Sequence, residues 1–121
     1  MLFAEARTQQ KLFAGHRFGR SFPYSLGIEE EFQILDRDGY GLVSKIDEML
    51  AELRPDAGDH VKRELYQSVV EISTGIARSV GQAVDELSEL RARLRDVAAA
   101  RGALIASAGT HPFSSPDATN W

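Results

Sequence analysis

The sequence predicts one α+β domain in which helices cover one face of a mainly antiparallel sheet. Three observations lead to this fold class. Apolar residues alternate over residues 25–36, β-branched residues fill a later extended segment, and a long amphipathic helix follows. The order strand, hairpin, helix, two strands, helix and strand favours an antiparallel sheet with the helices on one side. At 121 residues the chain has room for a single domain.

The first strand is predicted over residues 25–36, SLGIEEEFQILD, because its apolar residues recur at every second position. A turn follows at residues 36–39, where Gly39 can supply the positive φ that such turns often need. Residues 40–43 are expected to pair back onto the strand as a hairpin.

A helix is predicted next, beginning at a capping box over residues 44–47 and ending at Pro55, which cannot continue it. Two extended segments follow, at residues 60–65 and 67–76. The second, QSVVEISTGI, is rich in the β-branched residues that favour strands.

The long helix is predicted to begin at a capping box made by Ser79 and Gln82 and to end before Gly102. Residues 104–108 then form a short strand. One apolar stripe with helical spacing is expected to face the core. Its members are Val80, Val84, Leu87, Leu90, Leu94 and Val97.

Composition excludes several classes of function. The net charge is −4, whereas residues 1–22 carry four basic residues against one acidic residue. The acidic remainder argues against a nucleic-acid surface, since phosphate contacts need clustered Lys and Arg. Cysteine is absent and no apolar run reaches the length of a membrane span. We therefore expect a cytoplasmic protein with no membrane or nucleic-acid partner, and a loosely ordered extension at residues 1–22.

Paired glutamates are the first candidates for chemistry. Strand alternation places Glu29 and Glu31 on one face together with Gln33, and Glu30 on the other face. Carboxylates two residues apart on a strand can converge on one cation, and magnesium prefers such oxygen ligands. The alternative interpretation is a solvated acidic edge, which the apolar flanks of the strand oppose.

A second acidic pair lies in KRELYQSVVEISTG. Glu71 is a lone carboxylate among β-branched residues, where an unpaired charge would be costly to bury. The pattern leaves two roles open for it, a metal ligand or an ion pair with Lys62, Arg63 or Arg78. Glu64 has charged neighbours and is more ambiguous.

Four features of the chain, in this order, resemble the N-terminal region of the type 2 glutamate–cysteine ligase family. They are GIEEEFQILD, ELYQSVVEISTG, the long amphipathic helix and SAGTHPF. That family includes bacterial carboxylate–amine ligases and is similar in fold to glutamine synthetase. The resemblance covers residues 23–121. It implies that these residues form the N-terminal part of an incomplete, glutamine synthetase-like catalytic domain.

The resemblance also implies an activity. In the family, ATP phosphorylates the side-chain carboxylate of glutamate, and the amine of cysteine displaces phosphate to form γ-glutamylcysteine on the route to glutathione. The expected cofactors are ATP and Mg2+, and the expected partners are small-molecule substrates, namely amino acids and ATP. No catalytic acid or base is assigned. The metal ligands implied are Glu29, Glu31, Glu71 and Glu64, and the substrate contacts implied are Gln67, Thr74 and His111.

Family members are considerably longer, and their later part supplies further metal ligands and the basic residues that bind phosphate. We therefore expect negligible ligase turnover from these 121 residues alone. Two other readings stay open. One is a non-catalytic module that binds a partner, or a second copy of the chain, through an exposed sheet edge. The other is a related ligase that joins a different acid or amine.

Overall fold

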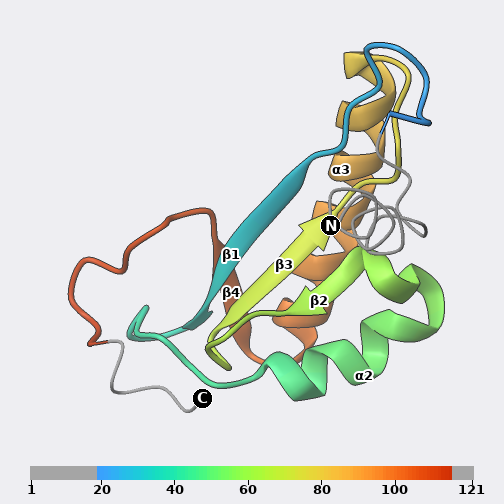
Figure 1. Cartoon of the computed structure of the whole chain (residues 1–121). Helices are drawn as coiled ribbons and strands as arrows, with labels where there is room; N and C mark the ends of the chain where they lie inside the picture. Colours follow the sequence, from blue (N-terminus) through green and yellow to red (C-terminus); the bar gives the residue numbers. More distant parts are fainter. Residues whose placement is uncertain (1–18, 116–121) are drawn as a thin grey trace, which may run out of the picture.

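Strand β1 (Glu29–Asp36) is an interior strand of the sheet in the structure, a computed structural model that describes residues 19–115. It pairs with β3 on one side and β4 on the other, which gives an antiparallel sheet in the order β2-β3-β1-β4 (Figure 1). The other strands are β2 (Val61–Arg63), β3 (Val69–Ser73) and β4 (Ala103–Ala106), and the helices are α2 (Ile46–Ala57), the short η1 (Gly58–His60) and α3 (Val80–Ala100). The predicted α+β class is confirmed.

Both α-helices pack on the same face of this sheet. Phe32 and Ile34 of β1 and Val70 and Ile72 of β3 are buried in one core with residues of α2 and α3, among them Leu94. Helix α3 contacts β3 and β4, whereas α2 contacts β2 and α3. In Figure 1, α3 runs behind the sheet and α2 lies beside β2. Within residues 19–115 the opposite face carries no helix.

Helix α3 has the termini that the sequence predicts. The Ser79 hydroxyl accepts a hydrogen bond from Gln82 N (3.2 Å), and Gln82 Oε1 accepts one from Arg78 N (2.9 Å), which satisfies two backbone donors at the helix start. Gly102, with φ +64°, follows the last turn, where a left-handed residue ends many helices.

The predicted apolar stripe of α3 is wrong at its N-terminal end. Val80 and Val84 are 67% and 49% exposed, whereas Ala83 is buried. In Figure 1 this end of α3 extends past the sheet, so its apolar side chains have no strand to pack against. From Leu87 onward the helix lies on the sheet, and Leu90 and the following stripe residues are buried or half-buried.

Two predictions for α2 are also wrong. Pro55 does not end the helix, which continues to Ala57 and stops at Gly58 (φ +55°). Proline has no backbone N–H, so Pro55 removes one hydrogen-bond donor from the last turn, and the helix ends two residues after it. The N-terminal cap is Lys45, with no side-chain capping bond, and not the box predicted over residues 44–47. Lys45 Nζ instead donates to Arg101 O (2.6 Å), which joins the start of α2 to the end of α3.

The predicted hairpin after β1 forms, but the positive φ predicted at Gly39 is found at the next residue. Asp36 N donates to Gly41 O (2.7 Å) and Val43 N to Ile34 O (3.0 Å), so residues 40–43 do pair back. Tyr40 (φ +56°), and not Gly39, has the left-handed backbone conformation. The Asp36 carboxylate accepts hydrogen bonds from the backbone of the turn, and this local support permits an unfavourable backbone conformation one residue later.

Strands β1, β2, β3 and β4 are shorter than the extended segments predicted at residues 25–36, 60–65, 67–76 and 104–108. The predicted extension at residues 1–22 lies mostly outside the described residues. Of its described part, Phe22 is 56% exposed, and the Arg78 guanidinium lies over its ring at 3.6 Å from the ring centre. Neither helix of residues 19–115 combines the length and apolarity needed to cross a membrane.

Candidate metal and substrate site

The helix-free face of the sheet carries polar side chains in cross-strand pairs. The antiparallel register of β1 and β3 places Glu31 opposite Glu71 and Gln33 opposite Val69. Directly opposed residues have Cβ atoms about 4.5–5.5 Å apart, and like charges in such positions destabilise a sheet. Two glutamates that lie opposite each other in the middle of paired strands therefore need a partner that neutralises their charge.

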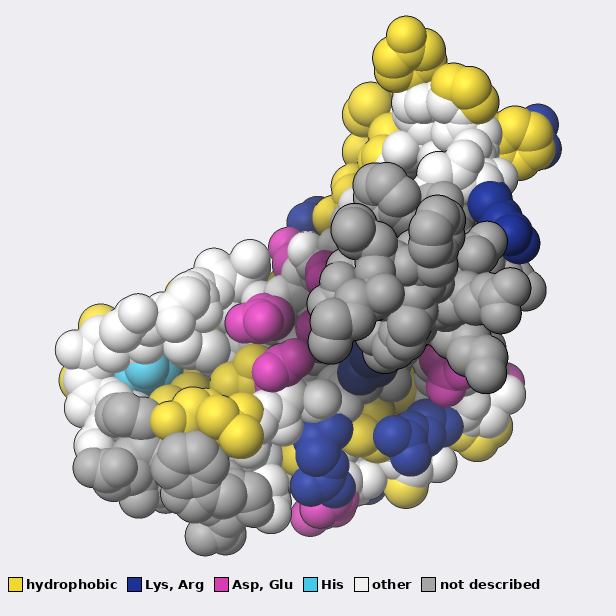
Figure 2. Space-filling view, in the orientation of Figure 1, with side chains coloured by type: hydrophobic (Ala, Val, Ile, Leu, Met, Phe, Trp, Pro, Cys, Tyr) yellow, Lys and Arg dark blue, Asp and Glu magenta, His cyan; other side chains and the backbone are white. Residues whose placement is uncertain are grey.

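A third carboxylate joins this pair from the connection between β2 and β3. One oxygen each of Glu31, Glu64 and Glu71 can be chosen so that all three lie within 4.8 Å of one another. Glu31 is exposed, whereas Glu64 and Glu71 are half-buried. Figure 2 shows acidic side chains gathered over the strands, with a histidine side chain farther along the same face. We call Glu31, Glu64 and Glu71 the carboxylate cluster.

One lysine partly compensates the negative charge of the cluster. Lys62 Nζ lies 3.2 Å from Glu71 Oε1, across the β2–β3 pairing. This is one of the ion pairs that the sequence left open for Glu71, while Arg63 of the same strand pairs with Asp47 instead. Among residues 19–115, a single ammonium against three carboxylates leaves an excess of negative charge.

The donor set of the cluster fits a hard divalent cation. All donors are carboxylate oxygens, and two ligands of an octahedral magnesium ion lie about 3.0 Å apart when adjacent and about 4.2 Å apart when opposite. The three oxygens of the cluster lie within 4.8 Å of one another, so side-chain rotations that bring them closer together would complete the geometry. Glu31, Glu64 and Glu71 would hold such an ion, and water or a phosphate would complete its coordination.

The other two glutamates of β1 are placed differently. Glu29 points to the same face as the cluster, opposite Ser73, but does not belong to the group of converging oxygens. Glu30 points to the helix side, where its carboxylate accepts two hydrogen bonds from Arg91 of α3 (2.6 and 2.8 Å). This bonding raises the pKa of Arg91 above its ordinary value. Glu30 therefore has a structural role.

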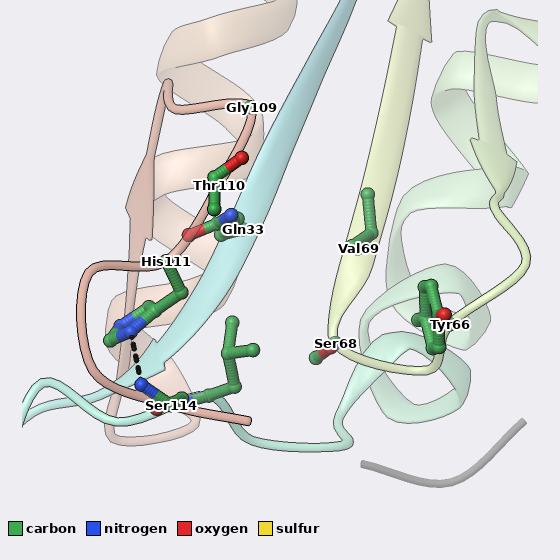
Figure 3. A pocket seen from close by; sticks show the side chains of 9 residues that line it. Gln33, Tyr66, Ser68, Val69, Gly109, Thr110, His111 and Ser114 are labelled. Atoms are coloured by element: carbon green, nitrogen blue, oxygen red, sulfur yellow. Dashed lines mark hydrogen bonds between the residues drawn. The ribbon is translucent and has the colours of Figure 1, made fainter. Parts of the chain in front are cut away.

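A pocket of about 290 Å³ adjoins the cluster on the same face. Gln33 follows Glu31 by two residues and Val69 precedes Glu71 by two, so the sheet runs continuously from the cluster into the pocket. Figure 3 shows β1, the end of the β2–β3 connection and the loop after β4 around this space. The lining residues are Gln33, Leu42, Tyr66, Ser68, Val69, Gly109, Thr110, His111 and Ser114. None of them is acidic or basic except His111.

His111 lies in this wall, as a substrate contact would, but both its ring nitrogens bond to backbone. Nε2 lies 2.8 Å from Tyr40 O, and Nδ1 lies 2.9 Å from Ser114 N. The ring can therefore offer a ligand its edge or face but no uncommitted nitrogen.

Gln67 and Thr74, the other two predicted substrate contacts, do not line the pocket. The Thr74 hydroxyl accepts from Ile28 N (2.9 Å) and donates to Gly75 O (3.0 Å), so it joins the segment before β1 to the end of β3. Gln67 O accepts from Ile46 N, the first residue of α2. Both residues contribute to the scaffold around the site.

The structure adds residues that sequence reasoning missed. Gln33 is 7% exposed, and Ser68 is buried beside it in the pocket. Gln33 could have been found, because strand alternation places it on the face of Glu31 and a buried amide needs partners. Tyr66, Ser68 and Thr110 lie in connections, where no periodic pattern indicates which way a side chain points.

Residues 25–120 match the model of glutamate–cysteine ligase family 2. A protein of Rubrobacter xylanophilus named "Putative glutamate--cysteine ligase 2-1" is 50% identical over 91 residues, which are 75% of this chain and 24% of that protein. A protein of Herpetosiphon aurantiacus named "Putative glutamate--cysteine ligase 2" is 44% identical over 94 residues, 78% of this chain and 24% of that protein.

The chain thus spans about a quarter of the length of these relatives. The match covers every helix and strand from β1 to β4, and with them the carboxylate cluster and all the residues that line the pocket. The chain belongs to glutamate–cysteine ligase family 2.

Proposed function

We propose that this chain provides part of the active site of an ATP-dependent carboxylate–amine ligase of the glutamate–cysteine type. The reaction would join the side-chain carboxylate of glutamate to the amine of cysteine, within a glutamine synthetase-like catalytic domain. One observation carries the proposal. In a member of this family, Glu31, Glu64 and Glu71 converge from three segments on one face of the sheet.

The carboxylate cluster would hold magnesium, with Glu29 next to it on the same strand face. When bound, the ion supplies neutralisation of the charge on the nucleotide phosphates and on the reacting carboxylate. Lys62 is tied to Glu71 and keeps that side chain on the β2 side of the cluster. The carboxylate cluster itself would fix the position of the ion and supply negative charge.

The adjoining pocket would bind part of an amino-acid substrate. Its amide and hydroxyl groups, from Gln33, Ser68 and Thr110 among others, can donate and accept hydrogen bonds. At about 290 Å³ it lies near the lower end of the volumes typical of ligand sites, about 300–1,000 Å³. A small molecule placed there would lie next to the cluster.

The ligase activity can be tested in a chimaera in which this chain replaces the matching quarter of the Rubrobacter xylanophilus relative. With ATP, Mg2+, glutamate and cysteine, we expect phosphate release and a dipeptide product detected by mass spectrometry. Glu31→Gln and Glu71→Gln should each lower the rate by at least about 100-fold, since each removes a ligand.

Glu30→Gln is the matched control, because Glu30 lies on the same strand but faces Arg91 of α3. It should keep the product rate within a few-fold of the parent chimaera. A folded chimaera that makes no product, while the intact relative does, would refute the proposed activity for this chain. A panel of amino acids in the same assay would identify a different acid or amine.

A further inference from the structure

One histidine ring joins the pocket wall at residues 109–115 to a distant turn of the fold. His111 Nε2 lies 2.8 Å from Tyr40 O, while Nδ1 lies 2.9 Å from Ser114 N and 3.3 Å from Phe113 N. A carbonyl oxygen only accepts and a backbone N–H only donates. Nε2 must therefore carry the proton, and Nδ1 must be unprotonated, so the ring is neutral and in one tautomer.

Each ring nitrogen has a distinct structural task. Nδ1 closes a local turn over Pro112, as an Asp or Asn oxygen does when it accepts from the backbone two and three residues later. Nε2 reaches out of the loop to the turn between β1 and α2, 71 residues earlier in the chain. A second bond joins the same two segments in the opposite direction, because Leu42 N donates to Ser114 Oγ (3.1 Å).

The receiving carbonyl belongs to a residue in an unusual conformation. Tyr40 has φ +56°, in a region that residues with a Cβ seldom occupy. Such conformations persist where surrounding contacts hold them, and they concentrate at functional sites. Here Tyr40 N donates to Asp36 O (3.0 Å) while Tyr40 O accepts from the histidine ring. The ring and the strained turn therefore support each other.

This junction shapes the pocket directly. Leu42, His111 and Ser114 are lining residues, and all three take part in the bonds between loop and turn. Gln33 and Tyr66 lie elsewhere around the same space (Figure 3). If the ring no longer joined the loop to the turn, the loop side of the pocket would move relative to Gln33.

We propose that His111 is a positioning residue, whose neutral ring fixes residues 109–115 as a wall of the pocket and so sets the pocket's shape. It would act through the loop and not by donating a ring nitrogen to substrate, which replaces the substrate contact expected from the sequence. The inference rests on the proposed function only in taking the pocket as a substrate site.

Which ring nitrogen of His111 carries the proton can be tested by 15N NMR of histidine side chains in the 121-residue chain. We expect His111 to show a protonated Nε2 and an unprotonated Nδ1. His60 is an internal control, because its Nδ1 lies 2.8 Å from Ser73 O and must therefore carry a proton. Detection of His111 with a protonated Nδ1 at neutral pH would overturn the proposal.

Two variants test the positioning role. His111→Asn keeps an oxygen that can close the local turn but cannot reach Tyr40, whereas His111→Ala loses all three hydrogen bonds of the ring. In both we expect the side-chain amide signals of Gln33 to shift and hydrogen exchange at Leu42 N to accelerate at least about tenfold, with His60→Asn as the matched control. Unchanged signals of Gln33 and Leu42 in His111→Ala, with the strand amides of β1 and β3 intact, would refute the role.

Neither measurement needs a substrate. A negative result in the NMR test of the His111 ring would therefore refute its positioning role without bearing on the proposed ligase activity. A confirmed junction in a chain that fails the metal and product assays would refute the ligase alone.

Discussion

Glu31→Gln should change the stability of the chain in opposite directions with and without magnesium. Glu31 has carboxylate neighbours in Glu71 and Glu64, whose oxygens lie within 4.8 Å. At that separation each pair of charges repels by about 0.9 kcal/mol in water, and salt screening together with the loss of attraction to Lys62 reduces the total. We therefore expect the metal-free variant to be more stable by about 1 kcal/mol or less.

Magnesium should reverse this order of stability, so that the parent chain becomes more stable than Glu31→Gln. If the parent site binds Mg2+ with a dissociation constant of about 1 mM, then 10 mM Mg2+ stabilises the folded state by about 1.4 kcal/mol. For a domain of this size that corresponds to a rise in Tm of roughly 5–7 °C. Glu31→Gln should gain little, because it has lost one of three converging ligands.

The assay is urea and thermal unfolding followed by circular dichroism, in EDTA and in 10 mM Mg2+, with Glu30→Gln as the control on the opposite face. Glu30→Gln should lose stability in both conditions and keep the full magnesium shift, since Glu30 bonds to Arg91. An equal magnesium shift in the parent and in Glu31→Gln, or a loss of stability for Glu31→Gln in EDTA, would contradict the electrostatic argument.

Four further predictions concern the scaffold and the activity. Leu94→Ala should cost about 3 kcal/mol in urea unfolding, because Leu94 is fully buried between α3 and the sheet. Arg91→Ala should destabilise slightly, and the loss should shrink in 0.5 M NaCl, since Arg91 is half exposed. Hydrogen bonds, first of all from Gly39 N, hold the pKa of Asp36 below its ordinary 3.8. Its stabilising contribution is therefore complete above that value and is lost as pH falls through the lower folded pKa, so Asp36→Asn should flatten the decline in stability below about pH 4. The 121-residue chain alone should release no phosphate above background with ATP, Mg2+, glutamate and cysteine; measurable product would contradict this.

The sequence was most informative where the pattern is local. Period-2 alternation in β1 correctly separates Glu31 and Gln33 from Glu30, because side chains of a strand must alternate between faces. The caps of α3 at Ser79 and Gly102 were predictable for the same reason, since each is set by a few neighbouring residues. These features required no knowledge of which segments pack together.

The sequence was least informative where distant segments meet. Alternation does not say which residue of β3 lies opposite Glu31, because register is set by the whole packed sheet. The position of Glu64 beside that pair depends on how the connection after β2 turns. Val80 has the spacing of a core residue but lies where α3 extends past the sheet. Thr74 continues a β-branched run, yet its hydroxyl bonds to backbone at the strand end.

Paramagnetic line broadening by Mn2+ in the 121-residue chain tests the central claim most directly. Substoichiometric Mn2+ should selectively broaden the backbone amides of Glu31, Glu64 and Glu71, and excess Mg2+ should restore them. The acidic groups around Asp56 and Glu89, on the helix side, serve as the comparison. Broadening centred there, or spread evenly over all acidic residues, would contradict a divalent-cation site on the face of the sheet opposite α2 and α3.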